Sequence, residues 1–413
     1  MSLRILPPLL IGLLTGISAH ADCSQQGKTL PYQPLADKNM EILFTPPGKN
    51  RKQGHARWIQ QIGRCGNYLQ MEMFHLTDPN VIAALKLAAK KIRVAHPGAA
   101  DNDLKVGVRV ILDNGFYNDA KNKPIIDDLT QAGVLVRPSS PSFTITHAKT
   151  LNCDGKTVFI TAMNMTKNEL STRDFGIVTK DPGVLTEHEF VFSSDWNNYR
   201  RTKDQGVLKL QLNDKNALLW SPQNSKEKML ALIQSAQPGK TIACSTESLT
   251  DTDVRDALVA ASQCNVDVRF LAPQCDENPC PLLNLPAIFK MNTDAKKVIA
   301  RVMPGTGSPQ TPYIHSKMCV VNFDAKTGTG GTVFVGSENS SANSLEHARE
   351  EGIVVRNDLA SKTIVKFFNS DWKQAVLPTD PNNCPQPKAA LGESPECEPA
   401  PTSPPSSAAG ATE

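Results

Sequence analysis

The sequence predicts an α/β fold of two tandem lobes related by a pseudo-twofold axis, each lobe a mixed β-sheet flanked by helices. Three observations support this prediction: strand patterns alternate with helix patterns, the alternation occurs twice, and short strings recur in one order at nearly one spacing. The 413 residues are 40% hydrophobic and 21% charged, which is a globular composition. Collagen-like, disordered and multi-span membrane classes are thereby excluded.

The hydrophobic periodicity predicts the same run of elements in each half. Runs rich in β-branched and aromatic residues predict strands, and apolar residues three and four apart predict helices. In the first half, strands are expected over 68–74 and 106–112, and helices over 79–92 and 125–132. In the second half, strands are expected over 240–246 and 266–271, and helices over 253–262 and 281–291. Strands and helices that alternate at these lengths form a sheet with helices on its faces.

Three short strings in the first half have counterparts in the second. In the first and third pairs the step is 176 residues (221 − 45 and 372 − 196). We therefore assign residues 22–205 to an N-terminal lobe and residues 206–376 to a C-terminal lobe. The pairs are Leu43-Phe44-Thr45-Pro46 with Leu219-Trp220-Ser221-Pro222, Leu76-Thr77-Asp78 with Leu249-Thr250-Asp251, and Phe192-Ser193-Ser194-Asp195-Trp196 with Phe368-Asn369-Ser370-Asp371-Trp372.

The N-terminus has the pattern of a cleaved signal peptide. Arg4 supplies a positive charge, residues 5–17 are nearly all apolar, and Ser18-Ala19-His20-Ala21 ends in the small-x-small pattern of a cleavage site. The apolar run is shorter than the ~20 residues of a membrane span, which argues against a single-pass anchor. Asp22 stands where a small residue should precede a lipidated Cys23, so lipidation is not expected. We expect residues 1–21 to be removed and the protein to be secreted or periplasmic.

The ten cysteines and the C-terminal tail fit an exported chain. Exported cysteines tend to form disulfides, and their spacing leaves the connectivity open. Cys275 could pair with Cys280, and Cys384 with Cys397. A zinc site is the alternative, but no cysteine pair has metal-finger spacing with matching histidines. Residues 377–413 hold nine of the 30 prolines and no aromatic residue, so this tail is expected to be extended or disordered.

A string of histidine and lysine occurs at equivalent places in the two halves. The first is HAKTLNCD (147–154), an H-x-K-x-x-x-x-D pattern, and the second is HSKMCVVN (315–322), which ends in Asn322 instead of aspartate. In a strand, residues two apart share a face, so the histidine and lysine of each string lie side by side. An imidazole beside an ammonium group suits a phosphodiester, because one attacks or protonates while the other neutralises anionic oxygen.

The two strings resemble the paired motifs of the phospholipase D superfamily. Each is followed by a strand with an asparagine, Asn164 or Asn339, and then by an acidic segment. Gly336-Ser337-Glu338-Asn339 follows the G-S-x-N pattern of the superfamily, whereas Thr161-Ala162-Met163-Asn164 keeps only the asparagine. The resemblance spans about residues 43–376. It implies two phospholipase D-like lobes that share one active site at their interface.

The resemblance implies a role for each motif residue. His147 is implied as the nucleophile that forms a phosphohistidine, and His315 as the acid that protonates the leaving oxygen and then activates water. Asp174 and Glu350 are implied to hydrogen-bond the histidines and fix their tautomers. No metal or other cofactor is required. The residues implied to hold the non-bridging oxygens are Lys149, Lys317, Asn164 and Asn339.

Two departures from the superfamily pattern leave open the alternative that the protein is catalytically inactive. Asn322 cannot form the ion pair expected of an aspartate, and Asp324 could replace it only if the chain bulges. Ala162 lacks the hydroxyl that Ser337 offers. An inactive module that binds lipid or polyanion is therefore one alternative.

The expected substrate is a glycerophospholipid at a membrane surface. A secreted phospholipase D would hydrolyse its head group and could transfer the phosphatidyl group to another alcohol. The net charge of +3 argues against a large nucleic-acid footprint. The second alternative is a metal-independent nuclease of the same superfamily, which would need a basic groove. Residues 281–289 could contact lipid, or form a helix packed on the sheet. We expect a monomer, in which each lobe donates histidine, lysine and asparagine.

Overall fold

The computed structural model describes residues 23–47, 53–273, 284–295, 297, 299–304 and 311–378. The expected signal peptide, the expected pairings of Cys275 with Cys280 and of Cys384 with Cys397, and the tail beyond residue 378 lie outside these residues. Among the helices of the described ranges, none has the length and apolar character needed to cross a bilayer.

The N-terminal lobe is built on a mixed sheet with the strand order β1-β7-β6-β5-β2-β3-β4. β2, β3 and β4 are mutually parallel, and the other neighbours are antiparallel. The predicted strands over 68–74 and 106–112 are confirmed as β2 and β3. The strands are β1 (Glu41–Thr45), β2 (Tyr68–Met73), β3 (Gly107–Leu112), β4 (Leu135–Pro138), β5 (Lys149–Cys153), β6 (Thr157–Thr161) and β7 (Thr172–Thr179).

The sheet of the C-terminal lobe repeats this order strand for strand, as β8-β15-β14-β13-β9-β10-β11. Here too three neighbours, β9, β10 and β11, are parallel and the rest antiparallel. This confirms the predicted α/β fold of two lobes with mixed sheets. The strands are β8 (Leu218–Ser221), β9 (Thr241–Ser245), β10 (Asp267–Pro273), β11 (Ala300–Met303), β13 (Lys317–Phe323), β14 (Thr332–Gly336) and β15 (Glu350–Arg356), and β12 (Tyr313–Ile314) joins the sheet of the other lobe.

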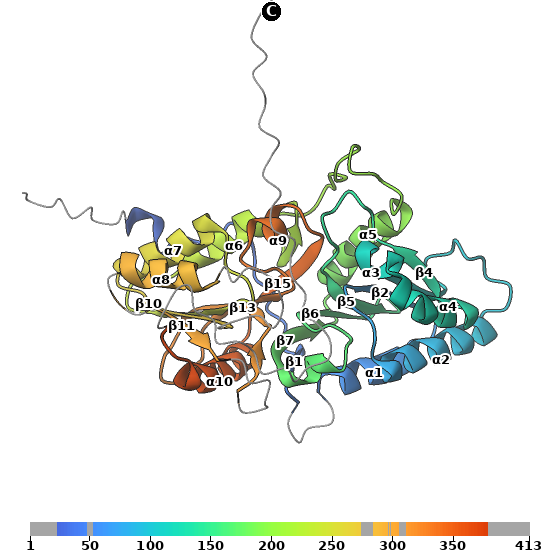
Figure 1. The fold of residues 1–413 in the computed structure, drawn as a ribbon, viewed down its shortest axis with the longest axis horizontal. Coiled ribbons are helices and arrows are strands. Elements are labelled where there is room, and N and C mark those ends of the chain that lie inside the picture. The colour runs from blue at the N-terminus through green and yellow to red at the C-terminus, as the bar shows by residue number, and fades with distance from the viewer. Residues whose placement is uncertain are drawn as a thin grey trace, which may run out of the picture.

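Helices cover both faces of each sheet in a pseudo-twofold arrangement. In Figure 1, α1 and α2 lie below the N-terminal sheet, whereas their counterparts α6 and α7 lie above the C-terminal sheet; α5 and α10 occupy the opposite faces. The predicted helices are confirmed as α2, α4, α7 and α8. The helices are α1 (His55–Arg64), α2 (Pro79–Ala95), α3 (Asn114–Asn118), α4 (Lys123–Gln131), α5 (Pro182–Asn197), α6 (Ser225–Gln234), α7 (Thr252–Gln263), α8 (Asn284–Asp294), α9 (Ala342–Glu346) and α10 (Asp358–Gln374).

The apolar segment proposed for lipid contact is partly a core helix instead. α8 buries Leu285, Ile288 and Met291, which lie three residues apart on one face. They pack into the core of the C-terminal lobe with Val266 and Ile299. In the part of this segment that the structure describes, the packed-helix alternative is the correct one, because burial in the core satisfies these side chains without a membrane.

A central hydrophobic core joins the two lobes. Phe175 and Ile177 of β7 share one cluster with Val333 and Val335 of β14, and with Trp220 of β8. Each lobe has a further core on its outer side, under α1 and α2 or under α6 to α8. The lobes are therefore parts of one packed body, which gives an interface site fixed walls.

Three disulfides connect the cysteines of the described residues, and these cysteines are all paired. Cys65–Cys153 ties the end of α1 to β5, and Cys244–Cys319 joins β9 to β13. Cys153 and Cys319, which follow the motif lysines in the chain, are thus both disulfide-bonded and buried. The third bond is Cys23–Cys264.

Candidate active site

At each motif histidine, the backbone of one lobe hydrogen-bonds to the backbone of the other lobe. The His147 N–H donates to the carbonyl of Arg349 at 2.9 Å, and the His315 N–H donates to that of Arg173 at 3.2 Å. In both halves, the residue before the histidine forms a parallel β-pairing with the same arginine. Each histidine is therefore seated against a strand of the opposite lobe.

The His147 ring is oriented by a carboxylate from the C-terminal lobe. Its Nδ1 lies 2.9 Å from Glu350 Oε2 and 3.2 Å from the Ser337 carbonyl oxygen. Ser344 holds Glu350 in turn, because its hydroxyl donates to Oε1 at 2.5 Å. A carboxylate on Nδ1 favours the tautomer with the proton there, so Nε2 carries the lone pair that a nucleophile needs.

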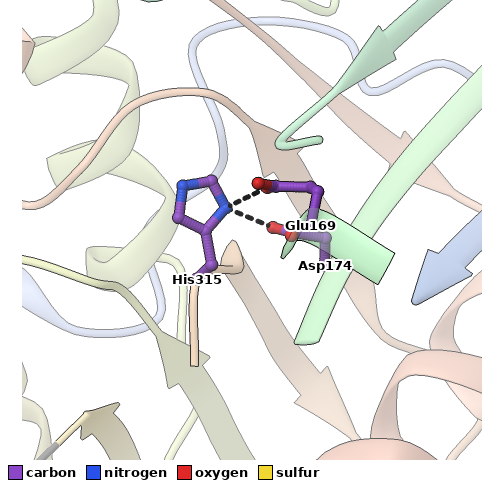
Figure 2. A group of neighbouring side chains, drawn as sticks. All are labelled: Glu169, Asp174 and His315. Atoms are coloured by element: carbon purple, nitrogen blue, oxygen red, sulfur yellow. Dashed lines mark hydrogen bonds and ion pairs between the residues drawn. The ribbon is translucent and has the colours of Figure 1, made fainter. Parts of the chain in front are cut away.

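The His315 ring is surrounded by three carboxylates. Its Nδ1 lies 2.9 Å from Asp174 Oδ1 and 2.8 Å from Glu169 Oε1, both from the N-terminal lobe. Figure 2 shows both carboxylates at this one ring nitrogen, with the other nitrogen pointing away from them. That nitrogen, Nε2, lies 3.5 Å from Glu247 Oε2.

These carboxylates set the protonation of His315. Burial alone would lower the pKa of His315, but the charges of Asp174 and Glu169 outweigh it and raise the pKa well above its usual range. Burial also raises the pKa of Glu169, and Asp174 adds to this rise. The pKa of Asp174 falls despite burial, because His315 favours its ionised form. The raised pKa favours the protonated form of His315, which suits a general acid.

Within the described ranges, the same cluster brings together three side chains that could hold a cation. Ligand atoms of Glu169, Asp174 and His315 lie within 4.8 Å of one another, and all three residues are buried. The ring nitrogen that faces the carboxylates forms a hydrogen bond of 2.9 Å with Asp174 and an ion pair of 2.8 Å with Glu169. A metal there would have to replace the proton that these bonds share.

The two motif lysines are buried beside their histidines but have different surroundings. Lys149 Nζ donates to the His147 carbonyl at 2.8 Å and lies 4.9 Å from the centre of the Phe74 ring. Lys317 Nζ instead forms an ion pair of 2.9 Å with Glu247. The halves therefore present one lysine against an aromatic face and one against a carboxylate.

The contacts of Ser337 bring the two motifs to one place. Its carbonyl oxygen faces His147 Nδ1, and the preceding residue, Gly336, is the cross-strand partner of Lys317. His147 of one lobe is therefore close to the strand that carries Lys317 and follows His315. The first motif of one lobe therefore lies beside the strand that carries part of the second motif.

The motif asparagines are positioned by the Leu-Thr-Asp strings. The backbone N–H groups of Thr77 and Asp78 both donate to the Met165 carbonyl at 2.8 Å, just after Asn164. The second string makes the equivalent pair of bonds, of 2.9 Å each, to Ser340, just after Asn339. Both aspartates also cap a helix, α2 or α7. In the second half, Asn339 Oδ1 accepts from Thr246 Oγ1 at 3.1 Å.

The Phe-x-Ser-Asp-Trp strings anchor the strands that carry the orienting carboxylates. Asp371 on α10 pairs with Arg173 at 2.7 Å, and Asp195 on α5 pairs with Arg349 at 2.9 Å. Each arginine immediately precedes Asp174 or Glu350 in the chain. Each pair also crosses between the lobes, so it fixes both the interface and the histidine's partner.

Removal of one of these aspartates should cost stability because it leaves a buried arginine without its partner. We expect Asp371→Ala to lower the free energy of unfolding by about 3–5 kcal/mol, measured by urea denaturation. The pair of the exposed Asp256 with the half-buried Arg255 supplies the matched control. Asp256→Ala should cost less than about 1 kcal/mol. Equal effects of the two substitutions would show that the buried pair does not anchor the fold.

The last residue of each motif braces the backbone. Asp154 accepts hydrogen bonds from the N–H groups of Gly66, Asn67 and Tyr68 at 2.8–2.9 Å. Asn322 does the same work through its amide, accepting from the Gln237 N–H at 2.7 Å and donating to the Ser235 carbonyl at 2.9 Å. Both residues have a positive φ, 58° and 67°, which Asn and Asp tolerate. The chain bulges at Asn322, but Asp324 does not take its place: it binds the N–H groups of its own turn.

Because Asn322 performs this bracing without a charge, Asp154→Asn should leave catalysis largely intact. We expect kcat to stay within about threefold of wild type, and the free energy of unfolding to fall by about 1–2 kcal/mol as one acceptor is lost. Steady-state kinetics and urea denaturation measure the two. A large loss of kcat in a folded variant would contradict the bracing role.

Sequence reasoning did not predict Glu169, Glu247 or Phe74. Glu247 precedes the Leu-Thr-Asp string by two residues, as Phe74 does in the other half, so an alignment of the strings would have placed both at the end of the strand before α2 or α7. Glu169 lies in the short helix before β7, and no repeated pattern marks it. His55 bridges Asp78 Oδ2 at 2.7 Å and the Asn164 carbonyl oxygen at 2.8 Å.

The pH dependence of activity should report the carboxylates around His315. The folded-state pKa of His315 lies above its unfolded value, so the stability it contributes is fully present below about pH 6.5 and is lost as the pH rises through the folded pKa. Activity that needs the protonated ring falls over the same alkaline range. We expect Glu169→Gln to move this alkaline limb of kcat/KM to lower pH, because the substitution removes one of the negative charges that raise the pKa of His315. An unmoved limb would contradict the role of Glu169.

Comparison with known proteins places this architecture in a family. The family model described as cardiolipin synthase, PLD-like domain matches residues 58–196 and 229–372. No curated protein matches the chain. The chain is similar to the crystal structure of phosphatidylserine synthase from Haemophilus influenzae Rd KW20, with a TM-score of 0.57 and 12% identity over 87% of this chain and 90% of that one.

Two further structures are similar to this chain. Polyphosphate kinase from Porphyromonas gingivalis has a TM-score of 0.55 and 13% identity over 83% of this chain, which spans 50% of the kinase. The phospholipase D family member Nuc from Salmonella typhimurium has a TM-score of 0.33 and 18% identity over 39% of this chain and 95% of that one. The chain therefore belongs to the family of cardiolipin synthase, phospholipase D-like domains, and carries that domain twice.

Proposed function

We propose that this chain is a phospholipase D that hydrolyses glycerophospholipid head groups through a phosphohistidine. One observation carries the proposal: each motif histidine is oriented by a carboxylate of the other lobe, Glu350 at His147 and Asp174 at His315, and His315 also lies close to Glu169 and Glu247. Negative charge around His315 favours its protonated form, which suits the acid. The eight predicted site residues keep their implied roles within the proposal, and all are buried.

The reaction proceeds in two displacements at phosphorus. His147 Nε2 attacks, the new N–P bond forms, and the bond from phosphorus to the head-group oxygen breaks as His315 Nε2 donates its proton to that oxygen. In the second step His315 takes a proton from water, the water oxygen attacks phosphorus, and the N–P bond breaks. Lys149 and Lys317 bring positive charge to the non-bridging oxygens, with Asn164 and Asn339 as amide donors.

Lipid is favoured over nucleic acid as the substrate. The net charge is +3 on 413 residues, which provides little of the phosphate neutralisation that nucleic-acid binding requires. The matching family model and one similar structure are named for enzymes of phospholipids, cardiolipin synthase and phosphatidylserine synthase. We also propose that the protein is exported, in keeping with the N-terminal pattern and with the three disulfides.

A paired assay tests the proposal. Purified protein is incubated in chelator with phosphatidylcholine vesicles and a primary alcohol, and in parallel with single- and double-stranded DNA. Formation of the phosphatidyl alcohol is expected, because the covalent intermediate can pass to an alcohol as well as to water. Nicked or digested DNA without lipid turnover would overturn the proposal in favour of a nuclease. A folded protein that turns over neither substrate would overturn it in favour of a binding module.

A further inference from the structure

We propose that Glu247 forms the subsite for the leaving alcohol and selects head groups that carry an ammonium group. The inference rests on the proposed function, which makes His315 the acid that protonates this alcohol. Glu247 lies just beyond β9, is only 8% exposed, and points its carboxylate at the reacting edge of His315.

The contacts of Glu247 fix its carboxylate next to the atoms that would release the head group. Oε2 lies 3.5 Å from His315 Nε2 and 2.9 Å from Lys317 Nζ. Oε1 accepts a hydrogen bond of 3.0 Å from the Tyr313 hydroxyl. Its main-chain carbonyl accepts from Asn284 Nδ2 at 2.6 Å. Both carboxylate oxygens and the main chain of Glu247 are therefore held in place, and the side chain does not need to move to meet a ligand.

The equivalent position of the other half shows that the fold does not require a carboxylate here. Phe74 stands two residues before its Leu-Thr-Asp string, as Glu247 does before the second. Its ring meets that of His147 edge-on, with centroids 4.8 Å apart, and lies under Lys149. At this one position the nucleophile half therefore carries an aromatic ring and the leaving-group half a carboxylate. A two-sided site of this kind distinguishes the ends of its substrate.

Charge decides which alcohol fits beside Glu247. Glu247 is paired with Lys317, and its carboxylate attracts a cation on the leaving group and repels a second anion there. Ethanolamine, serine and choline carry such a cation two carbons from the leaving oxygen. Glycerol does not, and a polynucleotide brings a second phosphate instead. An acceptor alcohol enters the same subsite in the reverse of the first step.

Two soluble short-chain lipids with the same acyl groups test the inference. We expect wild type to prefer dihexanoyl phosphatidylethanolamine to dihexanoyl phosphatidylglycerol, and Glu247→Gln to lower the ratio of their kcat/KM values about tenfold. Glu169→Gln is the matched control, because it removes a carboxylate from the same imidazole on the side away from the leaving group. It should change both kcat/KM values together and keep their ratio within about twofold.

The other outcomes are equally distinct. An equal fall of both kcat/KM values in Glu247→Gln would make Glu247 only a support for Lys317 and His315, and an equal rise would make it an internal competitor of phosphate. Either result overturns the inference while the proposed function stands. A folded wild-type protein that turns over neither lipid overturns the proposed function, and the inference with it. Thermal unfolding of both variants checks that they are folded.

Discussion

His147→Ala is expected to lower kcat/KM for a phospholipid by at least about 10,000-fold, because it removes the atom that forms the covalent bond to phosphorus. The ring lies 2.9 Å from Glu350 and is only 2% exposed, so the cavity left by alanine has fixed walls. Head-group release measured by a coupled assay gives the rate. His147→Asn, which keeps a polar side chain of similar size, should be as inactive.

The control for this loss is a histidine outside the site. His96 follows α2 and its Nε2 contacts the side chain of Asn67 on the surface. His96→Ala should keep kcat/KM within about twofold, as is usual for surface substitutions. A His147→Ala protein that folds and retains more than about 1% of wild-type activity would contradict a nucleophilic role, since no covalent route would remain.

His315→Asn is expected to be as damaging for a phospholipid but much less so for a nitrophenyl phosphodiester. The head-group alkoxide is a poor leaving group that must be protonated, and proton transfer contributes about 100- to 10,000-fold. Nitrophenolate leaves without a proton, so the first step survives. The second step then stalls, because the base that activates water is missing, and the measurement is a burst of nitrophenol of about one equivalent per active site.

Equal losses on both substrates would contradict this assignment. The opposite result, a burst in His147→Asn and none in His315→Asn, would exchange the two roles. The asymmetry in the structure makes this outcome unexpected. His315 faces Asp174, Glu169 and Glu247, whereas His147 is flanked by Glu350 and the Phe74 ring.

Much of the fold could be predicted from the sequence because the signals are local or repeated. Asp78 and Asp251 each precede a run of helical periodicity, and each is the cap of the helix that follows. The short strings recur because each holds part of the site: the string at Thr45 pairs with β7 so that Thr45 is the partner of Asp174, and Ser221 pairs with Glu350. The strand order of the sheets, by contrast, depends on pairings distant in sequence, which no local pattern encodes.

The motif residues of the site were predictable, but their surroundings were not. The spacing of two in each H-x-K string is a property of one strand, and it is visible in the sequence. Glu169 lies next to His315 because β12 of one lobe runs along β7 of the other. The residues that pair there are 141 positions apart in the chain. The bracing role of Asn322 depends on a positive φ and a bulge, and the sequence alone suggested a lost ion pair instead.

Mass spectrometry of the trapped intermediate tests most directly whether the two lobes form a single catalytic centre. The His315→Asn protein is mixed with a nitrophenyl phosphodiester, quenched under alkaline conditions that preserve phosphohistidine, and digested. We predict one phosphoryl adduct per chain, on the peptide that contains His147. Adducts on both motif peptides, or on neither while the burst is present, would contradict one shared site with His147 as its nucleophile.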